Sequence, residues 1–534
     1  MRNYLVLSLS VAALLFSAPA ALSQGPDVIS HRVGYDGSNS NDFRYYGQSG
    51  GIAAYSIATQ SCNIGTQVLD WYGNGVRHPV IAQNMYRLKD GVFEQLGQSW
   101  LKHSFCALSE PGCGNCQATN CDTLGIGCAD TYWASLNDGG SGGPKYQVNA
   151  LDGSHTHPYD SPSGTSSIRG RLQVATSDMD PAQNAGAEYF VECQYIAKDD
   201  HEAGNATNNA SWRPINVNSV NSITGNGVTV TQEAGIYAWA ANDPNVSITK
   251  VTNINEMGSG LNGTFYVAYA VTNNGNGTYH YQYAVHNLTS DQSAASFSIP
   301  VESGLTVTNV DFRDVDYHSG EPYSGTDWST TQGGGFLTFS TQSYSQNQNA
   351  NALRWGTMYS FGFDADAGPD PGTGQLGLFK PGNSSSLSFA IDGPGSCSAP
   401  TNYCVGASNS VGSGAHAGAS GSTSVADNSL QLYCWACPPS QFGIFFYGPN
   451  QVQLAFGDGY RCVGGSLYRF GVQQTSIWGD VMNAVDLTNP PAPSGQVTAG
   501  STWNYQFWYR DSTAGGGGPA GYNLSDGVSV TFCP

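Results

Sequence analysis

Residues 95–137 contain more groups capable of chemistry than any other stretch of the sequence. They include Lys102, His103, Asp130 and Tyr132, together with five of the 13 cysteines. A histidine that works with a nearby carboxyl group is a common general base. His103 and Asp130, with Lys102 and Tyr132, are therefore the candidate catalytic residues. The alternative is that His103 is a structural, hydrogen-bonded histidine.

The five cysteines in this stretch allow two interpretations. They are Cys106, Cys113, Cys116, Cys121 and Cys128. A C-x2-C pair fits a zinc site, whereas the thiols of an exported chain meet an oxidising compartment and form disulfides. The surrounding loop is rich in Gly, Ser, Asn and Thr, so it has little core and gains stability from cross-links. We predict that at least four of the five are disulfide-bonded and bind no metal.

The other cysteines give weaker signals. Cys434 and Cys437 form a second C-x2-C, but no βαβ pattern surrounds them, so a thioredoxin-like site is not indicated. A bridge between Cys462 and Cys533 would fasten the terminal strand to the rest of the chain. Because 13 is an odd number, one cysteine stays free unless it pairs between molecules.

Histidines also suggest a copper or zinc site formed by His103, His155 and His157. The H-x-H spacing of the last two places both rings on one side of a strand, as in several metal sites. These two residues lie in a Gly-, Ser- and Pro-rich loop, so an ordinary polar loop is the alternative. His78, alone before Pro79, is a weaker candidate still.

An acidic loop provides a third set of candidate ligands. The residues are Asp314, Asp316, His318, Glu321 and Asp327. Calcium prefers several carboxylate oxygens, so this loop is the candidate Ca²⁺ site. The alternative is a solvated loop in an acidic protein.

The N-terminus predicts a secretory signal peptide. Arg2 is followed by apolar residues 4–16 and by a small-x-small pattern at residues 21–23, which places cleavage near Ser23/Gln24. No later run of 18 or more apolar residues follows, so no transmembrane segment is expected. We expect a secreted or cell-surface protein.

The composition is typical of an extracellular all-β protein. The chain has 68 glycines, 12% aromatic residues and only 11% charged residues. Its formal net charge of −20 argues against nucleic acid as a partner, because phosphate binding needs clustered Lys and Arg. The charge is compatible with the binding of cations.

Alternating apolar and polar runs, separated by Gly, Asn and Pro, predict three successive β-rich units with very little helix. The first, residues 24–218, carries the cysteine loop. The second, residues 219–395, is predicted to be an immunoglobulin-like β-sandwich, and the third, residues 396–534, a C-terminal β-sandwich module. Tyr279, Tyr281 and Tyr283 share one strand face, either packed in the core or forming a platform for sugar stacking.

Several segments resemble known proteins. The C-terminal segment GSTWNYQFWYRD…GYNLSDGVSVTFCP, with QFGIFFYG and CVGGSLYRFG, resembles a β-module common on large secreted proteins of environmental bacteria. The segments GQSWLKHSFCAL, LGIGCADTYWASLN and DVDYHSGEPYSGTDW resemble an uncharacterised family of exported multidomain β-proteins from such bacteria. The resemblance implies export and architecture, and it transfers no catalytic residue.

Three functions follow as hypotheses. The first is a secreted or cell-surface β-domain protein with a structural role or a role in binding extracellular glycans or cations. The second is a secreted polysaccharide-acting enzyme with its site around His103 and Asp130, although the chain has neither a G-x-S-x-G nor an H-E-x-x-H motif. The third is a copper or zinc protein that uses His103, His155 and His157.

Overall fold

The computed structural model describes residues 25–35, 41–395, 399–425, 428–498 and 501–532. Strands make up 46% of the structure and helices 5%, which confirms the all-β prediction. None of the described helices is both long and apolar enough to span a membrane. The predicted signal peptide and Cys397 and Cys533 lie outside the described residues.

The chain divides into two compact units, neither of which is continuous in sequence. The first contains the described residues up to Met85, Gly97–Gly235 and His318–Glu321. The second contains Tyr86–Leu96, Ile236–Tyr317 and the described residues from Pro322 onward. The predicted boundaries near residues 218 and 396 stay predictions.

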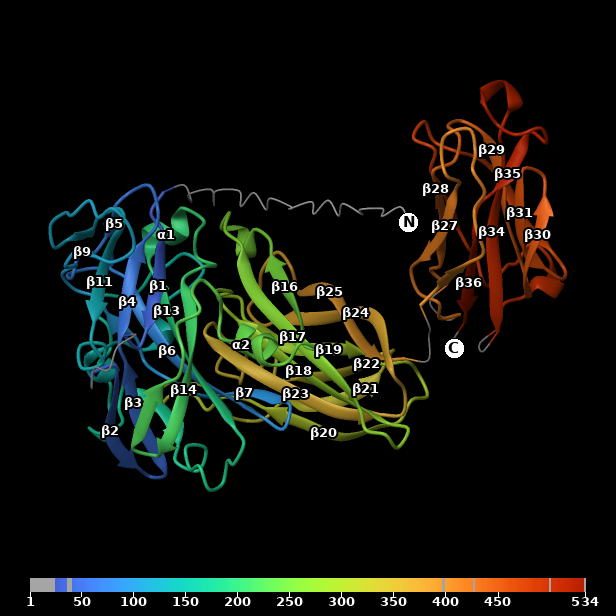
Figure 1. The fold of residues 1–534 in the computed structure, drawn as a ribbon. Helices are drawn as coiled ribbons and strands as arrows, with labels where there is room; N and C mark the ends of the chain where they lie inside the picture. The colour runs from blue at the N-terminus through green and yellow to red at the C-terminus, as the bar shows by residue number, and fades with distance from the viewer. Residues whose placement is uncertain (1–24, 36–40, 396–398, 426–427, 499–500, 533–534) are drawn as a thin grey trace, which may run out of the picture. The chain divides into compact units, whose positions relative to one another are not determined.

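Two larger sheets and a two-stranded ribbon contain the strands of the first unit, and the larger sheet also includes the end of β6 and most of β7, whose residues Tyr86–Leu96 are assigned to the second unit (Figure 1). One sheet has the order β1 (Val28–Val33), β4 (Thr59–Asn63), β11 (Cys128–Tyr132), β9 (Glu110–Pro111). The other has the order β15 (Ser222–Gly225), β14 (Ala210–Ser219), β13 (Glu188–Ile196), β6 (Val80–Lys89), β7 (Val92–Gln98), β12 (Leu172–Ala175), β3 (Ile52–Ile57), β2 (Phe43–Ser49), with β8 (Lys102–His103) paired to β6. The ribbon is β10 (Thr123–Leu124) with β5 (Leu69–Asp70), and the short helices are η1 (Gly139–Ser141), η2 (Lys145–Gln147) and α1 (Lys198–Glu202).

Disulfides hold the cysteine loop, as predicted. Cys106 pairs with Cys121, Cys116 with Cys128, and Cys113 with Cys62 on β4. All five loop cysteines are therefore bonded. The sequence did not indicate Cys62 as a partner, because it lies 51 residues before Cys113 in an unremarkable strand.

The cysteines outside the loop differ from expectation. Cys462 pairs with Cys404, so the proposed bridge from Cys462 to Cys533 is wrong. Cys193, Cys434 and Cys437 are unbonded and buried within the described part of the chain. The sulfur atoms of the last two lie 3.4 Å apart.

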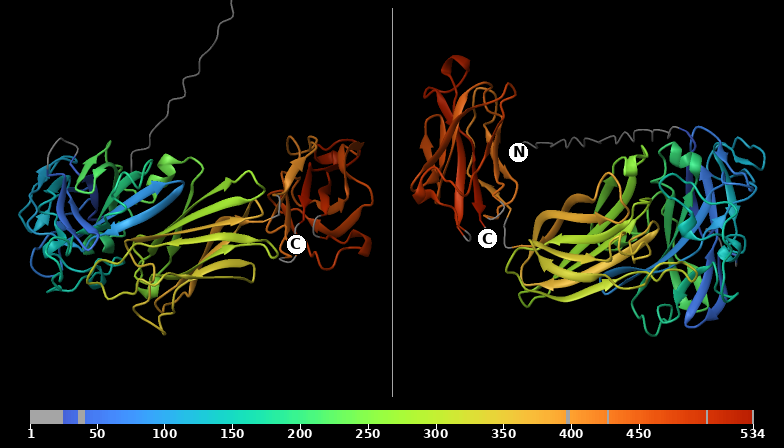
Figure 2. Two further views of the ribbon diagram at one scale, coloured as in Figure 1. Left: turned by 90° about the horizontal axis from the view of Figure 1, so that it is seen from below. Right: turned by 180° about the vertical axis from the view of Figure 1, so that it is seen from behind.

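A two-sheet β-sandwich forms in the second unit, in agreement with the prediction for this region (Figure 2). One sheet has the order β16 (Ser247–Asn253), β17 (Gly263–Asn273), β18 (Tyr279–Asn287), β23 (Thr357–Ala365), β20 (Val307–Arg313). The other has the order β21 (Ser329–Gly333), β22 (Phe336–Ser340), β19 (Ala294–Pro300), β24 (Pro369–Leu378), β25 (Ser386–Pro394). The short helices here are α2 (Tyr237–Asn242) and η3 (Glu256–Gly258).

The core of this sandwich is rich in aromatic rings from both sheets. Phe297 on β19 and Phe339 on β22 approach Phe361 on β23, with ring centroids 4.9 and 5.0 Å away. Tyr281 and Tyr283 on β18 are fully buried in the same core. Their strand face is therefore packed, and those two rings cannot form a platform for sugar stacking.

Residues from 399 onward form further antiparallel sheets with their own core. The largest has the order β26 (Thr401–Tyr403), β36 (Gly527–Thr531), β34 (Thr502–Arg510), β29 (Phe442–Gly448), β32 (Tyr468–Gln474), with β35 (Tyr522–Leu524) paired to β34. The others are β27 (His416–Ser420), β28 (Gln431–Trp435), β33 (Val481–Ala484), and the pair β30 (Asn450–Phe456), β31 (Gly459–Gly464); η4 (Pro493–Gly495) and η5 (Thr513–Gly515) are short turns of helix. Phe445, Phe507 and Leu432 meet in the core between the sheets.

The disulfides of the first unit predict different losses of stability. Cross-linking removes loop-closure entropy from the unfolded chain, and the effect grows with loop length. Replacing Cys62 and Cys113 with alanine, which opens a link of 51 residues, should lower the free energy of unfolding by ~4 kcal/mol. Replacing Cys116 and Cys128, which are 12 residues apart, should cost ~3 kcal/mol. Denaturant titration of both double variants measures this order, and a larger loss for the shorter link would contradict it.

Candidate functional site

Three histidines of the first unit meet in the structure. His103 lies on β8, where it pairs with Val80 of β6, and His78 lies just before that strand. His155 is held by an isolated bridge to Val148. Each ring offers one nitrogen, and the three nitrogens lie within 4.8 Å of one another. We call His78, His103 and His155 the histidine cluster.

Hydrogen bonds fix the protons of two rings. Nδ1 of His78 lies 2.9 Å from the carbonyl oxygen of Tyr72, which can only accept, so this nitrogen carries the proton. Nε2 of His78 then accepts from Nδ1 of His103 at 2.8 Å. Nε2 of His103 and both ring nitrogens of His155 have no hydrogen-bond partner among the described residues. The cluster therefore presents unused lone pairs in a buried place.

Burial keeps these rings neutral. The three residues are between 3% and 9% exposed. Loss of solvent, together with the neighbouring imidazoles, lowers the pKa of His78 to about 4 and that of His103 to about 2. The pKa of His155 is also lowered by burial. A neutral imidazole is the form that binds a metal ion, so all three are ready ligands at physiological pH.

The cluster differs from the predicted histidine set by one member. His103 and His155 are brought together as expected, but His157 is exposed and lies outside the group. His155 is held inside by its bridge to Val148, whereas the chain beyond it turns toward solvent. His78 takes the third place, although a lone histidine before a proline has no spacing signal that could have favoured it.

The predicted catalytic residues do not assemble around His103. Oδ1 of Asp130 accepts a hydrogen bond from the backbone nitrogen of Leu108 at 2.8 Å, while Oδ2 has no partner among the described residues. Burial raises the pKa of Asp130 to about 7. None of the bonds that the described residues make joins Asp130 to His103. Asp130 instead supports the backbone of the cysteine loop.

Tyr132 and Lys102 also support the loop. The hydroxyl of Tyr132 accepts from the backbone nitrogen of Phe105 at 3.0 Å and from Nε1 of Trp71 at 3.3 Å. The ammonium group of Lys102 lies 4.6 Å from the ring centroid of Phe105, a cation–π contact. These contacts give both residues a structural role, and the enzyme hypothesis stays a prediction.

The five candidate ligands of the acidic loop are divided between the two compact units. His318 and Glu321 belong to the first unit, whereas Asp314, Asp316 and Asp327 belong to the second. Within the described residues, no three of the five have ligand atoms within 4.8 Å of one another.

Three of these side chains have other contacts. Nδ1 of His318 donates to the carbonyl of Ser319 at 2.8 Å, and Glu321 accepts from the backbone nitrogen of Lys145 at 3.2 Å. The carboxylate of Asp314 accepts from the side chain of Asn351. Burial, together with the charges of Asp327 and Asp316, raises the pKa of Asp314 to about 6. The calcium site of Asp314, Asp316, His318, Glu321 and Asp327 stays a prediction.

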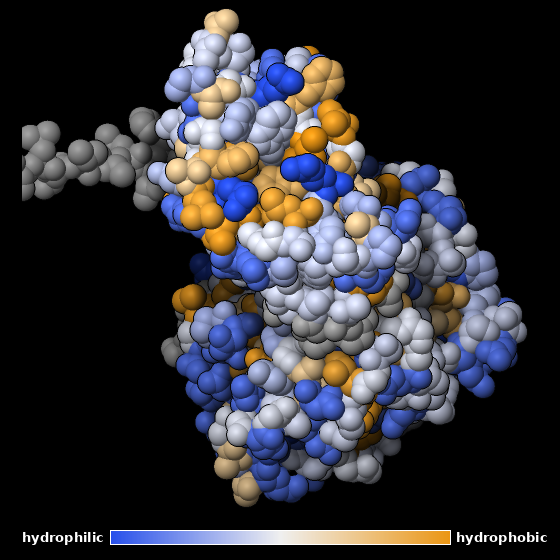
Figure 3. Space-filling view, turned by 90° about the vertical axis from the view of Figure 1, so that its right-hand side faces the viewer, coloured by the Kyte–Doolittle hydropathy of each residue, from blue (hydrophilic) through white to orange (hydrophobic). Residues whose placement is uncertain are grey.

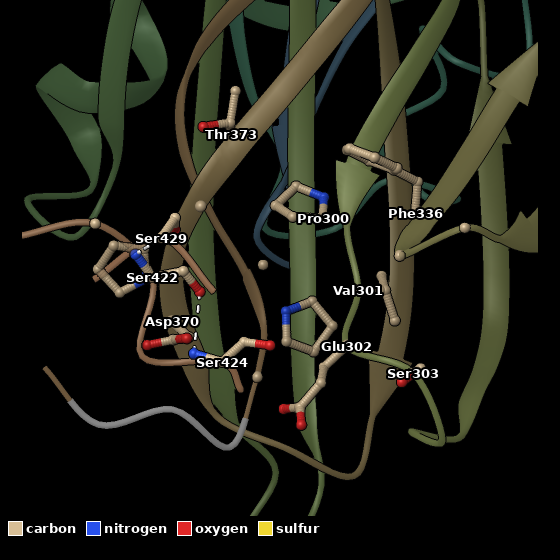
Figure 4. Close-up of a pocket in the computed structure, with 18 residues that line it drawn as sticks. Pro300, Val301, Glu302, Ser303, Phe336, Asp370, Thr373, Ser422, Ser424 and Ser429 are labelled. Atoms are coloured by element: carbon tan, nitrogen blue, oxygen red, sulfur yellow. Dashed lines mark hydrogen bonds between the residues drawn. The ribbon is translucent and has the colours of Figure 1, made fainter. Parts of the chain in front are cut away.

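The second unit contains a cavity that carries two carboxyl groups. This cavity is lined by Pro300, Glu302, Asp370 and Thr373, among others (Figure 4). Burial raises the pKa of Asp370 to about 6, with the charges of Glu302 and Asp392 adding to the shift. None of the described residues that line this cavity is a histidine or a cysteine. These two carboxyl groups alone do not define a chemistry.

Apolar side chains are exposed on the residues after 399. They include Phe442, Val472, Ile477, Trp478 and Met482. On the face seen in Figure 3, hydrophobic side chains lie among hydrophilic ones. Exposed aromatic rings are common in sugar-binding and protein-binding surfaces alike, so they do not identify a ligand.

Fold and cluster together define a disulfide-bonded, multidomain β-protein with a buried three-histidine group. No protein-family model and no curated protein sequence matches the chain. Among solved structures, the full-length major pilin SpaD from Corynebacterium diphtheriae is similar at 7% identity, over 95% of this chain and 91% of that one, with a TM-score of 0.17.

Two further structures are similar at the same low level. The Actinomyces fimbrial adhesin FimA matches at 11% identity over 54% of this chain and 98% of its own, with a TM-score of 0.11. A Salmonella alpha-2-macroglobulin mutant matches at 7% identity over 95% of this chain and 33% of its own, with a TM-score of 0.14. Scores this low carry no argument about function. The resemblance to exported proteins of environmental bacteria stays a hypothesis.

The buried carboxyl group of Asp130 predicts a pH dependence of stability. Its folded pKa of about 7 lies above the ordinary value of 3.8, so the folded state binds the proton more tightly than the unfolded state. This contribution is fully present below pH ~4 and is lost as the pH rises through 7, by as much as ~4 kcal/mol. Asp130→Asn should therefore flatten the fall in stability between pH 5 and 8.

Urea denaturation of the mature protein, followed by tryptophan fluorescence, measures this dependence because buried Trp71 lies in the same core cluster as Tyr132. Asp122→Asn, in the exposed part of the same loop, is the matched control and should leave the profile unchanged. An unchanged profile in Asp130→Asn would show that this carboxyl group does not titrate as its burial implies.

Proposed function

We propose that this protein is an exported, multidomain β-protein whose first unit binds one copper or zinc ion through His78, His103 and His155. The observation that carries this proposal is the cluster itself: three neutral imidazoles with ligand atoms within 4.8 Å in a buried place. Imidazole nitrogen suits both metals, and three histidines form known zinc sites. Export is supported by the predicted signal peptide and by four disulfides among the described residues, since such bonds persist in oxidising compartments.

The geometry of the cluster is close to what a metal requires. Zinc–nitrogen bonds of ~2.0–2.1 Å in a tetrahedron place two ligand atoms roughly 3.3 Å apart. The bonded nitrogens of His78 and His103 are 2.8 Å apart, so this pair would open slightly as an ion replaces the shared proton. His155 would move inward from its position within 4.8 Å.

The surroundings also resemble those of metal ligands. The carbonyl of Tyr72 holds the proton of His78 on Nδ1 and so directs the lone pair of Nε2 toward the other two rings. The ring of Tyr159 stacks on His103 with 3.7 Å between centroids and fixes its plane. Three protein ligands leave a fourth position for water or another molecule, which distinguishes such a site from a closed structural one.

Metal binding to the apo form of the mature protein tests the proposal. After chelator treatment, titration calorimetry with Cu²⁺ and with Zn²⁺ should show one equivalent bound. His78→Ala and His155→Ala should each weaken binding by at least ~100-fold, because each removes a ligand. At a hundredfold excess over Kd, the metal should also stabilise the folded state by ~2.7 kcal/mol.

Two histidines outside the cluster serve as controls. His157→Ala tests the nearby exposed residue, and His416→Ala tests a histidine on β27 in the other unit. Both variants should keep the wild-type affinity. No stoichiometric binding in the wild type, or equal binding in His155→Ala, would refute the proposal, and a loss in His157→Ala would refute this ligand set.

A further inference from the structure

A second group of polar residues is buried in the first unit, apart from the histidine cluster. Lys145, on η2, is 7% exposed, Asn84 on β6 is 1% exposed and Glu192 on β13 is fully buried. Strands β6 and β13 are neighbours in the large sheet, so Asn84 and Glu192 come from adjacent strands. A buried lysine is rare unless it is paired, and a buried charged pair is costly to keep.

Hydrogen bonds link Lys145 to Asn84 and Asn84 to Glu192. Nζ of Lys145 donates to Oδ1 of Asn84 at 3.4 Å, so the amine contacts the carboxamide group. The amide nitrogen of Asn84 donates to Oε1 of Glu192 at 2.7 Å. Oε2 of Glu192 accepts from the backbone nitrogen of Gly235 at 2.5 Å, which fixes the carboxylate. Lys145 thus supplies a nucleophile, Asn84 an electrophilic carbon, and Glu192 a proton acceptor at the departing nitrogen.

We propose that Lys145 and Asn84 form an intramolecular amide cross-link, with Glu192 transferring the proton. The amine nitrogen of Lys145 bonds to Cγ of Asn84, and the bond between Cγ and the amide nitrogen breaks. Lys145 attacks as the neutral amine, and Glu192 takes one proton from the attacking nitrogen and delivers it to the departing nitrogen. The products are one secondary amide and one ammonia molecule, and no oxidant, metal or cofactor takes part.

The surroundings favour this reaction. An ammonium ion has no lone pair, so Lys145 must first lose a proton. Burial lowers the pKa of Lys145 to about 8, although the charges of Glu321 and Glu192 oppose the shift. The neutral amine is therefore accessible near neutral pH. Contact between fixed groups in a dry site supplies the proximity that such a step needs.

A second carboxamide lies within reach of the same amine. Nζ of Lys145 also donates to Oε1 of Gln98, at 3.0 Å. Asn84 is nevertheless the favoured acceptor, because its amide nitrogen is the one bonded to Glu192, and a poor leaving group needs that proton. Gln98 then helps to orient the amine of Lys145.

Peptide mapping of the purified, reduced and alkylated mature protein tests the cross-link. Tandem mass spectrometry should find a branched peptide in which the Lys145 side chain is joined to that of Asn84, lighter than the two parts by one ammonia. The branched peptide should be absent from Lys145→Arg, Asn84→Ala and Glu192→Gln. It should persist in Gln98→Leu and in Lys198→Arg, where the lysine replaced is on α1 and pairs with Glu202.

A second measurement covers variants that fold poorly. In reducing, denaturing gels the wild type should migrate faster than Lys145→Arg, because the cross-link joins positions 61 residues apart. Linear wild-type peptides with a Lys145 amine that reacts with an acylating reagent and an unchanged Asn84 would overturn the proposal. A branched peptide at Gln98 would overturn the choice of acceptor.

Discussion

A polar side chain removed from water must find a partner, and the interior of the first unit is arranged around this constraint. The carboxamide of Asn84 directs its oxygen to the amine of Lys145 and its nitrogen to the carboxylate of Glu192. One neutral group on β6 thereby serves a cation on η2 and an anion on β13. An apolar residue at position 84 would leave both charges without this contact, at a cost of several kcal/mol in a buried place.

The β architecture could be predicted because its signal is local. Alternation of apolar and polar residues indicated strands near residues 264–272 and 358–365, and the structure has β17 (Gly263–Asn273) and β23 (Thr357–Ala365) there. The compact units could not be predicted in this way, because they depend on contacts between distant segments. His318–Glu321 belongs to the first unit although nearly a hundred residues of the second precede it, and no local pattern indicates this.

The candidate sites likewise combine residues that a sequence pattern indicated with residues that only the fold brings in. His103 and His155 were identified from residue type and spacing, but His78 joins them only because β6 pairs with β8. Cys62 reaches the cysteine loop from a strand with no motif, and Lys145 is ordinary in sequence until its burial is known. The acidic loop is a different case, because its five residues are close in sequence but are divided between the two units, and its calcium site stays a prediction.

The cross-link and the histidine cluster are connected through η2. Lys145 is the first residue of this helix. Val148, the first residue after the helix, forms the bridge that holds His155. An amide bond at Lys145 would therefore fix the start of the segment that positions one proposed ligand. Strand β6 fixes the other proposed ligands. It carries Asn84, the second residue of the cross-link, and it pairs with His103 through Val80. A metal site gains affinity when its ligands are held before the ion arrives, since less ordering is required on binding. The two proposed features would then act on one element of structure, and the covalent bond would preserve the spacing of the histidines when the metal is absent.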